Sequence, residues 1–234
     1  MKRQFKVKYL GHSAFLVDTD KYYLIFDYSG TTNEGGYGVT QVDIDFENYQ
    51  DKKIIMFGSH DHFDHYNRDI HEKAQKYNNI TTVLGDINCD FERTISMKPR
   101  EIKRLDDITI YTAGSTDMGV CFLVDLGNLV IFHGGDNADW GDGDPDNDLY
   151  YEELEYLSNI GLNIDIAFIP ICNFMGERPI KMIDGSLFAI EVLKPEYVFP
   201  MHAASREYIY EDFAKDVIKS TTQIICMKKI GEEF

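Results

Sequence analysis

Residues 59–66 read Ser59-His60-Asp61-His62-Phe63-Asp64-His65-Tyr66, so three histidines lie within six positions of one another. Buried imidazoles need hydrogen-bond partners, and neighbouring imidazoles repel one another once they are protonated. A divalent cation removes both difficulties, because zinc and similar ions prefer neutral imidazole nitrogens and carboxylate oxygens as ligands. The stretch therefore predicts a metal site, against the alternative of a solvated histidine-rich turn.

An apolar run directly precedes this motif. Lys53-Ile54-Ile55-Met56-Phe57-Gly58 is typical of a short buried strand that ends in glycine. The metal motif therefore begins where a buried strand stops, and strand ends are where α/β folds place their chemistry.

Two later apolar runs also end in metal-ligand residues: Ile131-Phe132-His133-Gly134-Gly135-Asp136 and Tyr197-Val198-Phe199-Pro200-Met201-His202. In this order, the three motifs resemble the metallo-β-lactamase superfamily. Near the start of the chain, Val7-Lys8-Tyr9-Leu10-Gly11-His12-Ser13 and Leu24-Ile25-Phe26-Asp27 are similar to one branch of that superfamily. This branch holds the ascorbate-6-phosphate lactonase-like proteins and many metal-dependent hydrolases.

The resemblance implies a site for one or two divalent ions, with zinc expected first and manganese or iron as alternatives. Its pattern assigns metal binding to His60, His62, Asp64, His65, Asp136 and His202. Asp136 would bridge the two ions. Asp64 would bind one ion and also orient the attacking group or accept its proton, which makes it the expected catalytic residue.

One element of the family pattern is missing. The third motif normally supplies a histidine to the same ion as His60 and His62, but no histidine lies between His71 and His133. Asp117 is a candidate replacement, because a carboxylate also binds zinc, manganese or iron. The alternative is that Asp117 is an ordinary turn residue in a Gly-Ser-Thr-Asp stretch. We therefore expect one tightly held ion and a second that exchanges readily.

Residues around these motifs are candidates for supporting roles. Asp27 matches a family position that orients a ligand histidine, although a strand-end turn is the alternative interpretation. His12 is expected to support the site without binding the metal. Arg178 and Lys181 are candidate contacts for an anionic substrate, and the single tryptophan, Trp140, is a candidate cover for the metals. His71, on an expected helix, is predicted to be exposed.

Composition narrows the function further. The formal charge of −17, from 40 acidic and 23 basic side chains, argues against a general nucleic-acid binder. No apolar run is long enough for a membrane span, and no signal-peptide core follows the basic N-terminus. Four dispersed cysteines are typical of reduced thiols in the cytoplasm. We expect a cytoplasmic protein whose partner is a small-molecule substrate; its oligomeric state is left open.

Strands and helices alternate along the chain in a pattern that predicts a single α/β domain over residues 1–234. The pattern and the resemblance both point to a four-layer αββα sandwich with mixed sheets. The expected strands cover residues 5–10, 14–18, 22–27, 53–58, 81–84, 108–111, 120–125, 129–133, 165–170, 197–201 and 222–227. The expected helices cover residues 67–77, 149–159, 185–193 and 210–219.

The resulting hypothesis is a metal-dependent hydrolase that uses a metal-bound hydroxide on a small ester, lactone or phosphodiester. The alternative is a metal-binding sensor or scaffold that binds a ligand without turnover, and the missing histidine motivates it. Redox chemistry on iron is a third option, but such superfamily members usually carry a flavin-bearing partner domain that this chain length excludes.

Overall fold

The structure is a computed structural model that describes residues 5–31, 39–141, 144–172, 174–175, 178–179, 182–217 and 221–234. The chain divides into two compact units, which are described one at a time. The first unit combines Met1–Met97 with Met227–Phe234, and the second is Lys98–Cys226. The expectation of a single domain stays a prediction.

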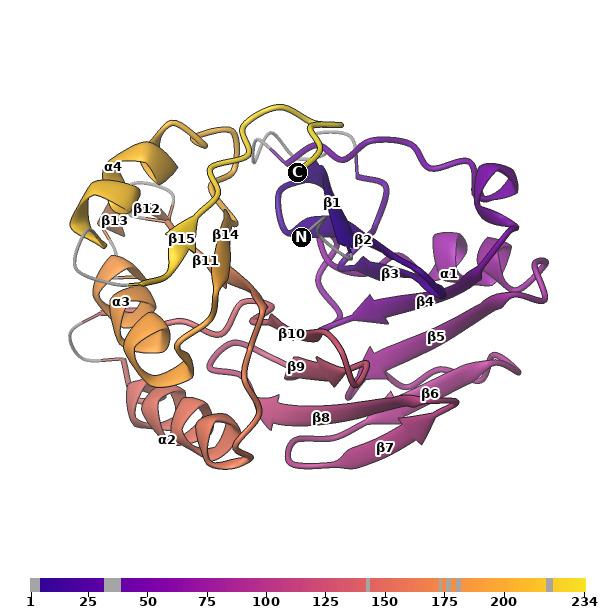
Figure 1. The fold of residues 1–234 in the computed structure, drawn as a ribbon, viewed down its shortest axis with the longest axis horizontal. Coiled ribbons are helices and arrows are strands. Elements are labelled where there is room, and N and C mark those ends of the chain that lie inside the picture. The colour runs from indigo at the N-terminus through magenta and orange to yellow at the C-terminus, as the bar shows by residue number, and fades with distance from the viewer. Residues whose placement is uncertain are drawn as a thin grey trace. The chain divides into compact units, whose positions relative to one another are not determined.

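A six-stranded mixed sheet forms the first unit (Figure 1). In spatial order its strands are β1 (Phe5–Gly11), β2 (Ala14–Thr19), β3 (Tyr22–Phe26), β4 (Lys53–Gly58), β5 (Ile80–Gly85) and β6 (Thr94–Met97). The first three strands form an antiparallel meander, while β3 to β6 run parallel. Because β3 and β4 are parallel neighbours, their carboxyl ends meet at one edge of the sheet. The residues that follow them are Asp27 and Ser59.

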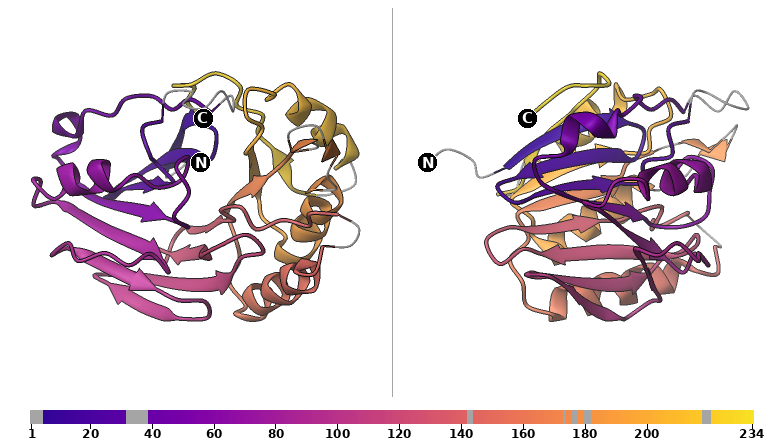
Figure 2. Two further views of the ribbon diagram at one scale, coloured as in Figure 1. Left: turned by 180° about the vertical axis from the view of Figure 1, so that it is seen from behind. Right: turned by 90° about the vertical axis from the view of Figure 1, so that its right-hand side faces the viewer.

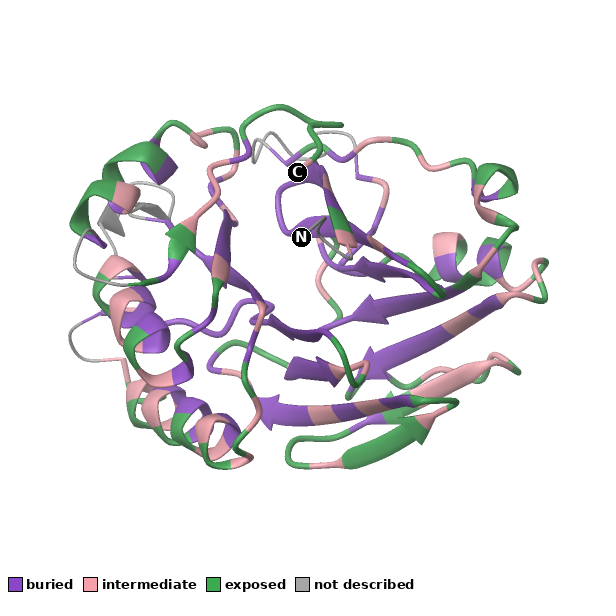
Figure 3. Cartoon of the chain, in the orientation of Figure 1, coloured by how far each residue is buried: buried purple, intermediate pink, exposed green. Residues whose placement is uncertain are grey.

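Among the described residues, two short helices accompany this sheet: the 3-10 helix η2 (Phe46–Tyr49) and α1 (Arg68–Ala74). The side chain of Asn67 caps α1 by accepting a hydrogen bond from the backbone N–H of Asp69. Phe46 and Ala74 are buried in a cluster with the apolar side chains of β3, β4 and β5. In Figure 3 the central strands are buried along almost their whole length, so the metal motif at the end of β4 emerges from a fixed support.

The second unit is a seven-stranded mixed sheet with helices. Its order is β15 (Gln223–Ile224), β14 (Tyr197–Met201), β11 (Ile166–Pro170), β10 (Val130–His133), β9 (Val120–Asp125), β8 (Ile108–Gly114) and β7 (Ile102–Leu105). Strands β7 to β10 are antiparallel, whereas β10, β11, β14 and β15 are parallel. A separate short hairpin joins β12 (Phe174–Met175) to β13 (Arg178–Pro179).

Three helices complete this unit: α2 (Asn147–Asn159), α3 (Met182–Leu193) and α4 (Ile209–Asp216). Helices α2 and α3 pack against each other, as the left view of Figure 2 also shows. All three bury apolar side chains, including Leu154, Ile190 and Phe213, in one cluster with strand residues of the sheet. None of the helices in the described part of the chain is long and apolar enough to cross a membrane.

The predicted fold class is confirmed: the described part of the chain is α/β, with two large mixed sheets and four α-helices. Strands β6 and β7 were not predicted, because each is four residues long and mixes polar with apolar side chains instead of forming an apolar run. Both lie at sheet edges, where charged and polar residues discourage pairing with another chain. Helix α1 is also shorter than the predicted 67–77.

The prediction that His71 is exposed is wrong. His71 is fully buried on the same face of α1 as Ala74, and its ring lies 4.8 Å from that of Tyr66. Neither ring nitrogen has a hydrogen-bond partner among the described residues. Burial, which penalises the charged form, lowers the pKa of His71 to about 4.

This buried imidazole predicts an acid-sensitive contribution to stability. The unfolded chain binds a proton at His71 near pH 6.5 that the folded chain rejects down to about pH 4. The free energy of unfolding should therefore fall as the pH drops through this window. Between pH 7 and pH 5 the wild type should lose about 2 kcal/mol more than His71→Leu. Urea unfolding of both proteins at the two pH values measures this difference, and equal losses would contradict it.

Candidate metal centre

Asp27 organises the metal motif of the first unit. It follows β3 and is fully buried, with its backbone in the left-handed region at φ 46°. One carboxylate oxygen accepts the backbone N–H of Ser59 at 2.7 Å, and the other accepts the Ser59 hydroxyl at 2.7 Å. That second oxygen also lies 2.7 Å from Nδ1 of His65. Asp27 thus holds the Nδ1 side of the ring and leaves Nε2 of His65 as the atom available for a metal.

His60 and His62 lie in contact with each other in the loop that follows β4. Nε2 of His60 lies 2.9 Å from Nδ1 of His62, and the two rings meet edge to face. On its other side, Nδ1 of His60 lies 2.9 Å from the Ser59 hydroxyl. Because two ring nitrogens this close can share only one proton, the pair offers lone-pair density to a cation.

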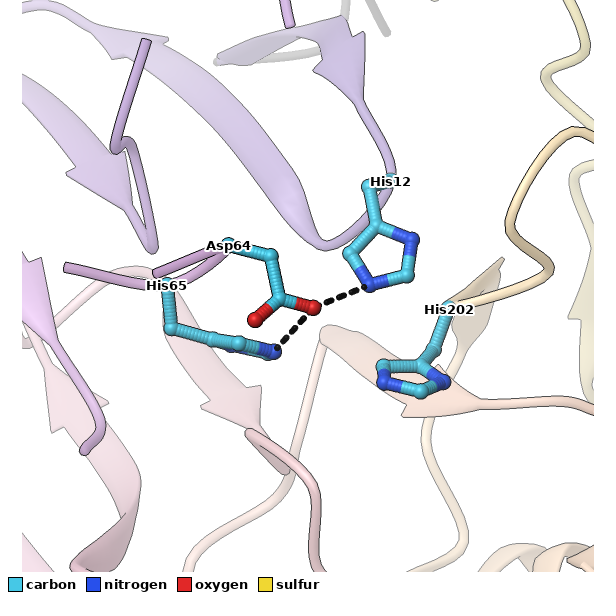
Figure 4. A group of neighbouring side chains, drawn as sticks. All are labelled: His12, Asp64, His65 and His202. Atoms are coloured by element: carbon cyan, nitrogen blue, oxygen red, sulfur yellow. Dashed lines mark ion pairs between the residues drawn. The ribbon is translucent and has the colours of Figure 1, made fainter. Parts of the chain in front are cut away.

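Asp64 lies between the imidazole rings of His12 and His65, as Figure 4 shows. One of its oxygens is 3.1 Å from Nε2 of His12 and 3.6 Å from Nε2 of His65. His12 is buried in the turn between β1 and β2, at φ 56°. Gly11 precedes it at φ 115°, and a Cβ atom there would collide with the carbonyl oxygen of Thr40. Ligand atoms of His12, Asp64 and His65 all lie within 4.8 Å of one another.

Gln41 holds the backbone beneath these residues and was not found by sequence reasoning. It is buried, and its amide nitrogen donates to the carbonyl oxygens of Asp27 and Asp64 at 3.1 and 2.9 Å. Its amide oxygen accepts the backbone N–H groups of Ser29 and Gly30 at 2.8 and 3.0 Å. One side chain therefore ties the end of β3 to the metal motif.

In the second unit, Asp136 and His202 meet. Asp136 follows β10 and His202 follows β14, and both strands belong to the parallel part of the sheet. Nε2 of His202 lies 3.1 Å from a carboxylate oxygen of Asp136, which is buried. Gly134 allows the turn before Asp136, because a Cβ there would press on Pro170 at 3.2 Å. His202 itself has φ 68°.

Asp117 also belongs to this group. It lies in the exposed turn between β8 and β9, and a carboxylate oxygen lies within 4.8 Å of a ligand atom of Asp136. The turn therefore places a carboxylate next to Asp136. The geometry places Asp117 beside a candidate ligand, whereas turn chemistry in the sequence had favoured an ordinary turn role.

The remaining candidates have different surroundings. Lys181 and the side chain of Arg178 lie outside the described residues, so their expected substrate contacts stay predictions. Trp140 is half-buried, and its indole N–H donates to the Thr116 hydroxyl at 3.0 Å. His133 is buried and accepts the N–H of Gly135 at 3.2 Å, which stabilises the turn before Asp136.

These donor sets suit a divalent cation. Each unit presents imidazole nitrogens beside carboxylate oxygens, which are the ligands of zinc, manganese and iron. The His65 ring is oriented by a buried carboxylate, an arrangement found around metal-binding histidines.

Comparison with known proteins identifies the family. The family described as the beta-lactamase superfamily domain matches residues 6–202 of this sequence. The chain belongs to this family. A protein from Desulforamulus reducens called "UPF0173 metal-dependent hydrolase" is 27% identical over 97% of this chain and 98% of its own length. A protein of the same description from Thermococcus kodakarensis is 27% identical over 98% of each chain. The resemblance inferred from the motifs is confirmed.

A solved structure supports the same fold. Igni18, described as a metallo hydrolase from Ignicoccus hospitalis, has a TM-score of 0.69 and 19% identity. The match covers 98% of this chain and 97% of Igni18. At this identity the similarity establishes the fold and leaves the chemistry to be argued from this chain's own residues.

The Asp27 geometry generates a test of metal binding. In Asp27→Asn, an amide NH2 group replaces one carboxylate oxygen and faces groups that now donate hydrogen bonds to that oxygen. His65 should therefore lose its fixed orientation. Zinc affinity should fall by about 10- to 100-fold, the usual cost of removing such a partner. Competition with a chromogenic chelator measures it. Asp20→Asn, at an exposed position of the same unit, is the control and should match the wild type.

Proposed function

We propose that the two groups of residues are the halves of a two-metal hydrolase site. One ion is held by Asp64, His65, Asp136 and His202, and the other by His60, His62, Asp136 and Asp117. Family membership and the order of the motifs support this assignment. One observation carries it: in each unit, a histidine nitrogen and a carboxylate oxygen approach each other, Asp64 beside His65 and Asp136 beside His202.

The bound cations supply two things: they lower the pKa of water to about 7, and they stabilise the negative charge that develops on the substrate. The chain's own groups do the rest. Asp64 orients the attacking group and accepts its proton, and His12 holds the Asp64 carboxylate from the other side at 3.1 Å. Asp27 keeps His65 in the required orientation. His12 and Asp27 are positioning residues under this proposal.

The substrate is a small ester, lactone or phosphodiester. The curated relatives are named metal-dependent hydrolases, which supports hydrolysis without naming a substrate. A charge of −17 disfavours nucleic acid as the partner. The cytoplasm is the proposed compartment, because four dispersed cysteines are typical of reduced thiols there. Zinc is the proposed tight ion, and Trp140, Arg178 and Lys181 remain the proposed substrate contacts.

Replacing the catalytic carboxylate tests the proposal directly. Asp64→Asn keeps the volume of the side chain but removes its capacity to accept a proton. We expect kcat/KM to fall by about 10²- to 10⁴-fold, the contribution typical of a positioned general base. The measurement is hydrolysis of a panel of aryl esters, lactones and aryl phosphodiesters by the metal-loaded protein.

Asp61→Asn is the matched control, because Asp61 is an exposed aspartate of the same loop. It should retain wild-type rates. If the wild type and Asp64→Asn showed the same turnover on every substrate, the alternative function, a sensor or scaffold that binds a ligand without turnover, would be favoured instead.

The two ions should differ in how tightly they are held. The first has three protein ligands besides the shared Asp136, while the second depends on the exposed Asp117 to complete its set. After dialysis, elemental analysis should find close to one equivalent of metal, and a second equivalent should bind reversibly. Asp117→Ala should weaken only the second. Two equally tight ions in both proteins would show this asymmetry to be wrong.

A further inference from the structure

Hydrogen bonds of the Thr116 side chain join the loop that carries Asp117 to the loop that carries Asp136. The Thr116 hydroxyl donates to the carbonyl oxygen of Ala138 at 2.8 Å. The same oxygen lies 3.0 Å from the backbone N–H of Ala138 and 3.0 Å from the indole N–H of Trp140. A hydroxyl has one donor and two acceptor positions, so these contacts use its full capacity.

The backbone of Thr116 adds a fourth contact. Its N–H donates to the side-chain oxygen of Asn137 at 3.1 Å, and both residues are buried. We call Thr116, Asn137, Ala138 and Trp140 the Thr116 clasp. On the other side of the loop, the N–H of Gly114 donates to the buried carboxylate of Glu153 at 2.7 Å. The exposed turn is therefore held at its base by buried hydrogen bonds.

The clasp acts on the two carboxylates through their neighbours in the chain. Asp117 directly follows Thr116, and Asp136 directly precedes Asn137. Like charges at this separation, with ligand atoms within 4.8 Å, disfavour each other in the absence of a cation. An exposed aspartate in an unfastened turn would move away into solvent. The clasp opposes that movement and keeps a site for a cation between the carboxylates.

We propose that the Thr116 clasp presents Asp117 as the replacement for the missing histidine, and that the second metal position is therefore rich in oxygen ligands. Two imidazoles and two carboxylates make that position more favourable to manganese(II), relative to zinc, than three imidazoles and one carboxylate. Thr116 and Trp140 are positioning residues in this proposal. It rests on the two-metal site proposed above and adds the preference of one position within it.

Thr116→Val tests the clasp, because valine keeps the shape of threonine and removes the hydroxyl. With one equivalent of zinc already bound, the affinity for manganese(II) should fall roughly tenfold or more, as for other lost supporting contacts around metals. The electron paramagnetic resonance signal of free manganese(II) measures this affinity. Thr116→Ser retains the hydroxyl and should stay close to the wild type.

The single tryptophan gives a readout that needs no metal. Because its indole N–H is bonded to the Thr116 hydroxyl, Trp140 emission should shift in metal-free Thr116→Val and not in Thr116→Ser. A valine variant with wild-type emission and wild-type manganese(II) affinity would overturn the role of the clasp. If Thr116→Val melts at a lower temperature than the wild type, Thr116→Ser and Asp117→His still test the proposal.

Asp117→His tests the ligand preference by restoring a third imidazole. The ratio of manganese(II) to zinc affinity at the second position should fall by about tenfold or more. Asp107→His places the same imidazole at an exposed turn of the same unit and should leave the ratio unchanged. An unchanged ratio in Asp117→His would overturn the assignment of Asp117.

Failure of the two-metal site itself has a different signature. In that case the wild type would fail to retain the first equivalent of zinc, or Asp136→Ala would retain it. If the first ion behaves as proposed and only the Thr116 and Asp117 variants have no effect, the roles assigned to the Thr116 clasp and to Asp117 are wrong while the two-metal site stands.

Discussion

The metal motif of the first unit depends on one buried negative charge. A carboxylate removed from water costs several kcal/mol unless it is paired and hydrogen-bonded, and Asp27 has no exposed surface. Ser59 supplies two donors and His65 lies at hydrogen-bond distance, so the loop must take the conformation that satisfies the charge. The parallel register of β3 and β4, which pairs Phe26 with Phe57, makes this contact geometrically available. The sheet thus determines where the candidate ligands lie.

Backbone strain is also present at several residues of the candidate site. His12, Asp27 and His202 all adopt left-handed φ values, a conformation that non-glycine residues rarely adopt. Each costs about 1–3 kcal/mol and persists only where the surroundings enforce it. The Gln41 amide and the strand ends provide that enforcement in the first unit. Side chains held this way need little rearrangement to receive a cation, which is the advantage of preorganisation.

The sequence predicted what is local and missed what is tertiary. The apolar strands and the histidine motif are contiguous, so residues 53–65 could be interpreted without any other part of the chain. Gln41 was missed because its role depends on contacts with Asp64, far along the sequence. His71 was misjudged because burial of its helix face depends on the sheet beneath it. Thr116 resembles any turn threonine until Ala138 and Trp140 are brought beside it.

The missing histidine changes the charge of the proposed centre as well as its geometry. Two divalent cations carry four positive charges, and Asp64 and Asp136 offset two of them in the family pattern. With Asp117 as a further ligand, one more charge is offset, and the loaded centre attracts anions less strongly. The acidic character of the whole chain acts in the same direction. Under the proposed two-metal assignment, this charge balance would favour a neutral ester or lactone over a negatively charged phosphodiester.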